Sequence, residues 1–114
     1  MYQATRPLRI IIAEDHELMR LGLRLIINRD DGVEVIGEAR NGVEAVSLAI
    51  EWLPDLALLN WHMPRMDGLA CARDIKLYAS SVKTLVMSGA PITTAVLDSL
   101  GQGVDGFIDK DVSA

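Results

Sequence analysis

The chain has 114 residues, half of them hydrophobic, and a formal net charge of -5. This length suits one domain rather than two, and the acidic balance argues against nucleic-acid binding by this segment itself, because phosphate binding needs a basic surface. The single cysteine, Cys71, excludes an internal disulfide and a cysteine metal cluster. No apolar run approaches the ~20 residues of a membrane span, and the N-terminus lacks the apolar segment of a signal peptide, so we expect a soluble cytoplasmic domain.

Short apolar runs alternate with longer amphipathic stretches along the chain. The short runs predict strands, and apolar residues spaced three and four apart predict helices between them. In chain order we expect a strand Leu8–Ala13, a helix His16–Asn28, a strand Val33–Glu38, a helix Val43–Leu53, a strand Leu56–Asn60, a helix Leu69–Ala79, a strand Thr84–Ser88, a helix from Pro91 to about Gln102, and a strand Val104–Asp109. The shared apolar faces are Leu18, Leu21, Leu25 and Ile26 on the first helix, and Val46, Ala49, Ile50 and Leu53 on the second.

Strict alternation of strand and helix predicts an α/β fold whose parallel sheet carries helices on both faces. We expect the doubly wound, flavodoxin-like form, with five strands in the order 2-1-3-4-5. The ligand site of such a sheet lies at the carboxyl ends of its strands. Asp15, Asn60, Ser88 and Lys110 all fall at or just past predicted strand ends, so topology alone should bring them to one edge.

Only four residues follow Lys110. A sheet of this order normally carries a fifth helix at that point. We therefore expect residues 1–114 to be a single domain truncated before that helix, which would leave a large apolar patch on one face of the sheet.

Several motifs at these strand ends are specific as a set. They are Glu14-Asp15, the run from Leu58 to Gly68 with Met63-Pro64 and Asp67-Gly68, Ser88, Phe107, and Lys110 three residues after Phe107. Together they resemble the receiver domain of bacterial two-component response regulators. The segments Arg9–His16 and Val35–Ala39 are most similar to the NarL/FixJ (LuxR-type) subfamily, whose receivers precede a C-terminal helix-turn-helix DNA-binding domain.

The resemblance implies a role for each site residue. Asp15 would bind Mg²⁺ directly and Glu14 largely through water, while position 60 and the backbone carbonyl of His62 would complete the protein's ligands. Ser88 would donate a hydrogen bond to a phosphoryl group on residue 60, and Lys110 would pair with that group as a point charge. Phe107 would be the aromatic side chain whose rotamer follows the state of the site, although ordinary core packing is at least as good an explanation for it.

Asn60 departs from the family pattern, because receivers carry the phosphate-accepting aspartate at this position. An amide is a very poor nucleophile, so we expect no acyl phosphate, and Mg²⁺ binding should be weakened by the lost charge. Two explanations compete: a substitution that holds an ordinary receiver unphosphorylated, or a natural pseudo-receiver that acts as a phosphorylation-independent interaction or dimerisation module. The intact Glu14, Asp15, Ser88 and Lys110 favour the first.

The implied function is relay of a sensor histidine kinase signal to transcription, not enzymatic turnover of a separate substrate. Homodimerisation is possible, DNA would be contacted only through a C-terminal domain absent here, and no membrane contact is expected. A haloacid-dehalogenase-like phosphatase also uses an aspartyl phosphate in a similar fold. That family needs Asp-x-Asp at the first strand end, whereas this chain has adjacent Glu14-Asp15.

Overall fold

The computed structural model describes residues 6–89, 98 and 102–109. Five strands and three helices are found in this part of the chain: β1 (Leu8–Ala13), α1 (Glu17–Ile27), β2 (Val33–Ala39), α2 (Gly42–Trp52), β3 (Leu56–Asn60), α3 (Gly68–Tyr78), β4 (Lys83–Ser88) and β5 (Gly106–Asp109). Of the predicted helix from Pro91 to about Gln102, only residues 98 and 102 are among those described. Lys110 lies outside the described residues.

The five strands form one sheet in the order β2-β1-β3-β4-β5, and every neighbouring pair is parallel. This confirms the predicted doubly wound, flavodoxin-like topology. Because β1 and β3 lie side by side in the middle, the residues that follow them meet at one edge of the sheet.

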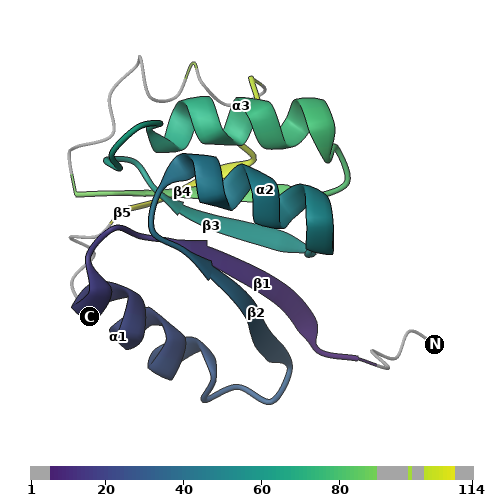
Figure 1. Ribbon diagram of the computed structural model, residues 1–114. Coiled ribbons are helices and arrows are strands. Elements are labelled where there is room, and N and C mark those ends of the chain that lie inside the picture. The colour runs from purple at the N-terminus through teal and green to yellow at the C-terminus, as the bar shows by residue number, and fades with distance from the viewer. Residues whose placement is uncertain (1–5, 90–97, 99–101, 110–114) are drawn as a thin grey trace.

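Helices cover both faces of the sheet, with α1 on one side and α2 and α3 on the other (Figure 1). Side chains of β1 alternate between two apolar clusters, as the pleat of a strand requires. Ile11 packs in the cluster beneath α2 and α3, and Ile12 packs in the cluster on the α1 side. Cys71 of α3 is fully buried in the larger cluster.

Two helices begin one residue earlier than their apolar pattern indicates, because a side chain caps each of them. Asn41 accepts a hydrogen bond from the backbone N–H of Glu44 at 2.9 Å, and Asp67 accepts one from Ala70 at 2.8 Å. Such caps satisfy N–H groups that have no partner within the helix. Gly42 and Gly68 therefore belong to α2 and α3.

The last strand begins at Gly106 rather than at Val104 as predicted. The carboxylate of Asp105 accepts the backbone N–H of Thr84 at 2.8 Å, so a side chain takes a donor that a strand carbonyl would otherwise take. Lys76 pairs with the same carboxylate at 2.6 Å. Regular β4–β5 pairing starts only after this contact, with Leu85 opposite Gly106.

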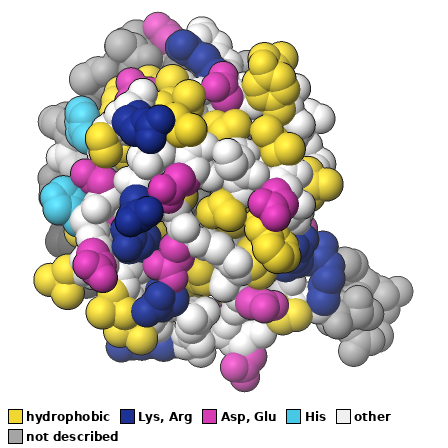
Figure 2. Space-filling model, in the orientation of Figure 1, with side chains coloured by type: hydrophobic (Ala, Val, Ile, Leu, Met, Phe, Trp, Pro, Cys, Tyr) yellow, Lys and Arg dark blue, Asp and Glu magenta, His cyan; other side chains and the backbone are white. Residues whose placement is uncertain are grey.

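The predicted apolar faces of the first two helices are only partly the faces that pack. On α1, none of residues 17–27 is fully buried; Leu23 and Ile27 contact the sheet, whereas the predicted residues are exposed, namely Leu18, Leu21, Leu25 and Ile26. On α2, Ala45 and Ala49 are buried, but Ile50 is exposed, as is Leu53 directly after the helix. Hydrophobic side chains accordingly reach the surface toward the lower left of Figure 2, where α1 lies.

Candidate functional site

Three of the residues singled out in the sequence lie buried at the carboxyl edge of the sheet. Glu14 directly follows β1, Asn60 is the last residue of β3, and Ser88 is the last residue of β4; they are 1%, 6% and 3% exposed. Polar side chains are costly to bury without hydrogen bonds, so three of them together mark a specialised part of the molecule. Ser88 lies opposite Asp109, the residue before Lys110, in the β4–β5 register.

The acidic pair lies next to His16 at this edge. Carboxylate oxygens of Glu14 and Asp15 and a ring nitrogen of His16 lie within 4.8 Å of one another. The Glu14 oxygen Oε2 also accepts the backbone N–H of His16 at 3.2 Å. Oxygen ligands crowded in this way suit a hard divalent cation in their chemistry.

Asp15 stays ionised in this setting. Partial burial acts to raise the pKa of its carboxyl group, but interactions with Glu14, its own backbone, His16 and Asn60 outweigh burial and lower that pKa. Its oxygen Oδ1 is buried and has no hydrogen-bond partner among the described residues. The carboxylate therefore presents negative charge to the edge of the sheet.

Asn60 joins the end of β3 to its surroundings through both hydrogens of its amide. Its Nδ2 atom donates to Oε2 of Glu14 at 3.1 Å and to the backbone carbonyl of His62 at 2.8 Å. These oxygens come from two residues to which the family resemblance gives a role in metal binding. The carboxylates of the pair fit a cation, whereas an amide NH₂ directed at the same oxygens does not, because it competes for their lone pairs.

Backbone hydrogen bonds hold the turn after β3 close to the ends of β3 and β4. The backbone N–H of Gly68 donates to the carbonyl of Trp61 at 2.8 Å, and Trp61 in turn donates to Met87 of β4 at 2.8 Å. A Cβ atom on residue 68 would lie 2.6 Å from the Asn60 carbonyl oxygen. Glycine is thus required here by the close approach of α3 to the site.

An aromatic group borders the site. The Trp61 ring lies 6.2 Å from the His62 ring and 5.9 Å from the Phe107 ring, centroid to centroid. Phe107 also packs against the larger apolar cluster, which supports a packing role for it. Its predicted role as a switch remains a prediction.

Sequence reasoning missed two residues that border the acidic pair. His16 is exposed at the start of α1, and its ring lies 3.5 Å from Glu14 and 3.6 Å from Asp15. Arg20 donates to the backbone carbonyl of Glu14 at 2.8 Å and pairs with Glu38 at 3.3 Å. The only available signal for Arg20 was a basic residue one turn into a helix that follows an acidic pair.

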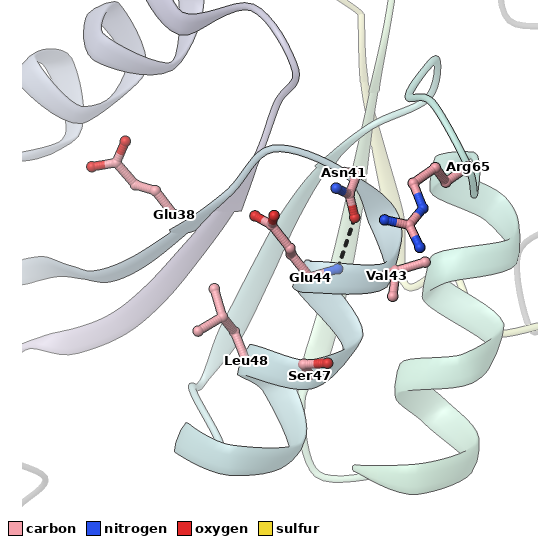
Figure 3. A pocket seen from close by; sticks show the side chains of 7 residues that line it. All are labelled: Glu38, Asn41, Val43, Glu44, Ser47, Leu48 and Arg65. Atoms are coloured by element: carbon pink, nitrogen blue, oxygen red, sulfur yellow. Dashed lines mark hydrogen bonds between the residues drawn. The ribbon is translucent and has the colours of Figure 1, made fainter.

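A separate hollow of about 330 Å³ lies beside this edge. It is lined by residues of β2, α2 and the β3–α3 turn (Figure 3), where Arg65 lies across Asn41 from Glu38. None of the predicted site residues lines it. The hollow is therefore distinct from the buried polar cluster.

Residues 10–114 match the model of the response regulator receiver domain. The chain belongs to this family. This match favours the receiver domain over a haloacid-dehalogenase-like phosphatase, for which the chain also lacks the Asp-x-Asp motif.

The transcription-regulator subfamily is represented among the relatives. The chain is 36% identical over 103 residues to a probable transcriptional regulatory protein NarL of Mycobacterium tuberculosis, covering 90% of this chain and 48% of that protein. The solved signal receiver domain of the NarL response regulator from M. tuberculosis superposes with a TM-score of 0.88 at 34% identity, covering 95% of this chain and 87% of the other. These similarities confirm the relation to NarL/LuxR-type regulators.

Receivers also occur in enzymes. A protein-glutamate methylesterase/protein-glutamine glutaminase of Geobacter metallireducens is 35% identical over 112 residues, which is 95% of this chain and 30% of that protein. The chain thus spans half or less of both relatives. In the part of the chain that the structure describes, no helix is long and apolar enough to cross a bilayer.

Proposed function

We propose that this receiver domain serves a two-component response regulator of the NarL/LuxR type, and that it cannot accept a phosphoryl group. Asn60 carries this proposal. It is buried at the end of β3 beside Glu14, where the family places its aspartate nucleophile, and its amide nitrogen has no lone pair available for attack. A sensor histidine kinase is the proposed upstream partner, and transcription in the cytoplasm is the proposed output.

The other site residues take the roles that the family resemblance gives them. Glu14 and Asp15 would hold Mg²⁺ with the His62 carbonyl, more weakly than a site with three carboxylates. A cation bound there would neutralise charge on a phosphoryl group. Ser88 and Lys110 would contact that group, and Phe107 would follow the state of the site, in a form of the protein with aspartate at position 60.

The chain itself is proposed to have no catalytic turnover. The methylesterase relative is matched over only 30% of its length, so its named activity need not reside in the matched part. DNA contact is likewise proposed to come from sequence outside this domain, because the NarL relative is matched over 48% of its length and this chain is acidic.

We also propose that a helix following β5 packs on α1. The support is the exposed apolar face of α1 and a groove of about 570 Å³ lined by His16, Leu18, Met19, Gly22, Leu23 and Ile26. Hydrogen exchange of the α1 amides should slow in a longer chain that includes this helix. Unchanged exchange would count against it.

A phosphorylation-independent module is the second candidate. Both hydrogens of the Asn60 amide have acceptors in the site, Glu14 and the His62 carbonyl. This favours the second candidate, because asparagine is then a well-accommodated residue at position 60. Homodimerisation is one form that such an interaction could take.

Intact mass after incubation with Mg²⁺ and acetyl phosphate separates the two candidates. The test compares this chain with Asn60→Asp. If only the aspartate form gains a phosphoryl group, the rest of the site is competent and one residue holds the receiver off. If neither form gains it, the phosphorylation-independent module is the better account.

A further inference from the structure

The Asn60 amide lies where two oxygen atoms from separate segments converge. Oε2 of Glu14 comes from the end of β1, and the carbonyl of His62 comes from the turn after β3. Each accepts one of the two amide hydrogens, at 3.1 Å and 2.8 Å. A single NH₂ group thus joins the residue after β1 to the turn after β3.

The orientation of this amide follows from the chemistry of its neighbours. With nitrogen and oxygen exchanged, Oδ1 would face a carboxylate and a carbonyl, neither of which has a hydrogen to donate. An ionised aspartate would meet the same conflict and would add a third negative charge beside Glu14 and Asp15. With aspartate at position 60, the site would need a positively charged partner for its oxygens, and a bound cation would be such a partner.

We propose that the Asn60 amide substitutes for the divalent cation of a receiver site, so that this domain is organised without metal. This inference rests on the proposed function, since it assumes a receiver-type site. The amide supplies the positive ends of two N–H dipoles to oxygens that would otherwise repel one another. A cation that used those oxygens would have to break both hydrogen bonds.

The test measures unfolding by urea with and without Mg²⁺, on this chain and on two variants. At a Mg²⁺ concentration that saturates Asn60→Asp, the unmodified chain should show the same midpoint with and without Mg²⁺. Asn60→Asp should be less stable without Mg²⁺ and should recover when Mg²⁺ is added. Asn60→Leu, of similar size but without a donor, should be destabilised in both conditions.

Direct binding gives an independent measurement. Trp61 lies against the His62 ring, so its fluorescence reports on the site, and replacing Trp52 by Phe in every variant leaves Trp61 as the single tryptophan. Mg²⁺ should change the Trp61 fluorescence of Asn60→Asp at concentrations on the order of tenfold or more below those needed for the protein that keeps Asn60. The reason is that Mg²⁺ affinity rises with the number of charged ligands.

Two outcomes would overturn the inference. One is an equal rise in the midpoint of the unmodified chain and of Asn60→Asp on adding Mg²⁺. The other is an Asn60→Leu variant as stable as the unmodified chain without metal. The Mg²⁺ comparison stands even if Asn60→Leu does not fold.

Failure of the inference can be told apart from failure of the proposed function. If Asn60→Asp alone accepts phosphate but both forms bind Mg²⁺ equally, the function holds and the cation substitution is wrong. If neither form accepts phosphate while Mg²⁺ stabilises only Asn60→Asp, the cation substitution holds and the proposed function is wrong.

Discussion

The guanidinium group of Arg20 on α1 donates a 2.8 Å hydrogen bond to the backbone carbonyl of Glu14. The same side chain pairs with Glu38 of β2 and is largely buried, at 13% exposure. Arg20 therefore fixes the backbone of Glu14, the first residue of the acidic pair, relative to α1 and β2. Because charged hydrogen bonds in such settings are stronger than neutral ones, this contact should be measurable in stability.

We predict that Arg20→Met lowers the free energy of unfolding by about 1–3 kcal/mol, since it removes the donor to the Glu14 carbonyl and leaves Arg24 as the remaining arginine partner of Glu38. Urea denaturation measures this change. Arg40→Met is the matched control: Arg40 is 72% exposed and meets Glu44 at only 3.5 Å, so its loss should stay within about 0.5 kcal/mol. Equal losses in the two variants would show that Arg20 does not brace Glu14.

Gly68→Ala should destabilise the domain by about 1–3 kcal/mol through crowding. Its Cβ atom would press on the Asn60 carbonyl, a backbone atom that cannot rotate away. Gly22→Ala provides the contrast, because a Cβ there meets nothing within 4 Å and alanine favours the interior of α1. That control should gain about 0.5–1 kcal/mol in unfolding experiments. A Gly68→Ala variant as stable as the unmodified chain would contradict the close packing of α3 on the site.

Asp55 should make stability depend on acid pH. Hydrogen bonds from the Arg6 guanidinium, at 2.8 and 3.0 Å, and from the backbone N–H of Arg9 lower the pKa of its carboxyl group to about 2. A lowered pKa in the folded state stabilises the fold above the unfolded pKa of about 3.9, and this stabilisation is lost as pH falls toward 2.

We expect Asp55→Asn to lower stability at pH 7 by about 1 kcal/mol, allowing for solvent screening of a surface pair. Its unfolding free energy should also fall less than that of the unmodified chain between pH 4 and pH 2. High salt should narrow the difference between the two proteins at pH 7. Parallel acid profiles would rule out Asp55 as the source.

The two faces of α1 should respond differently to substitution. Leu25 is 59% exposed, so Leu25→Gln should change the free energy of unfolding by no more than about 0.5 kcal/mol. Ile27 packs against the cluster formed by Ile10, Ile12, Leu58 and Met87, so Ile27→Ala should cost about 1–2 kcal/mol. A larger loss for Leu25→Gln than for Ile27→Ala would mean that the predicted face of the helix is the buried one.

The sequence by itself determined the sheet and the edge at which the site lies. The strands Leu8–Ala13 and Leu56–Asn60 have the predicted bounds, because each is a short apolar run ended by polar or turn residues. Strand–helix alternation and the handedness of crossovers then restrict the strand order. From that order, the approach of Glu14 to Asn60 follows without any knowledge of side-chain contacts.

Only the tertiary structure decided which atoms meet. The apolar residues of α1 are spread around much of its circumference. Their spacing therefore did not distinguish Leu23 and Ile27, which pack on the sheet, from their exposed neighbours. The pairing of the Asn60 amide with Glu14 depends on side-chain directions at the ends of two separate strands. A one-dimensional pattern holds the identity and spacing of such groups, whereas their hydrogen bonds are fixed by the three-dimensional positions of donors and acceptors.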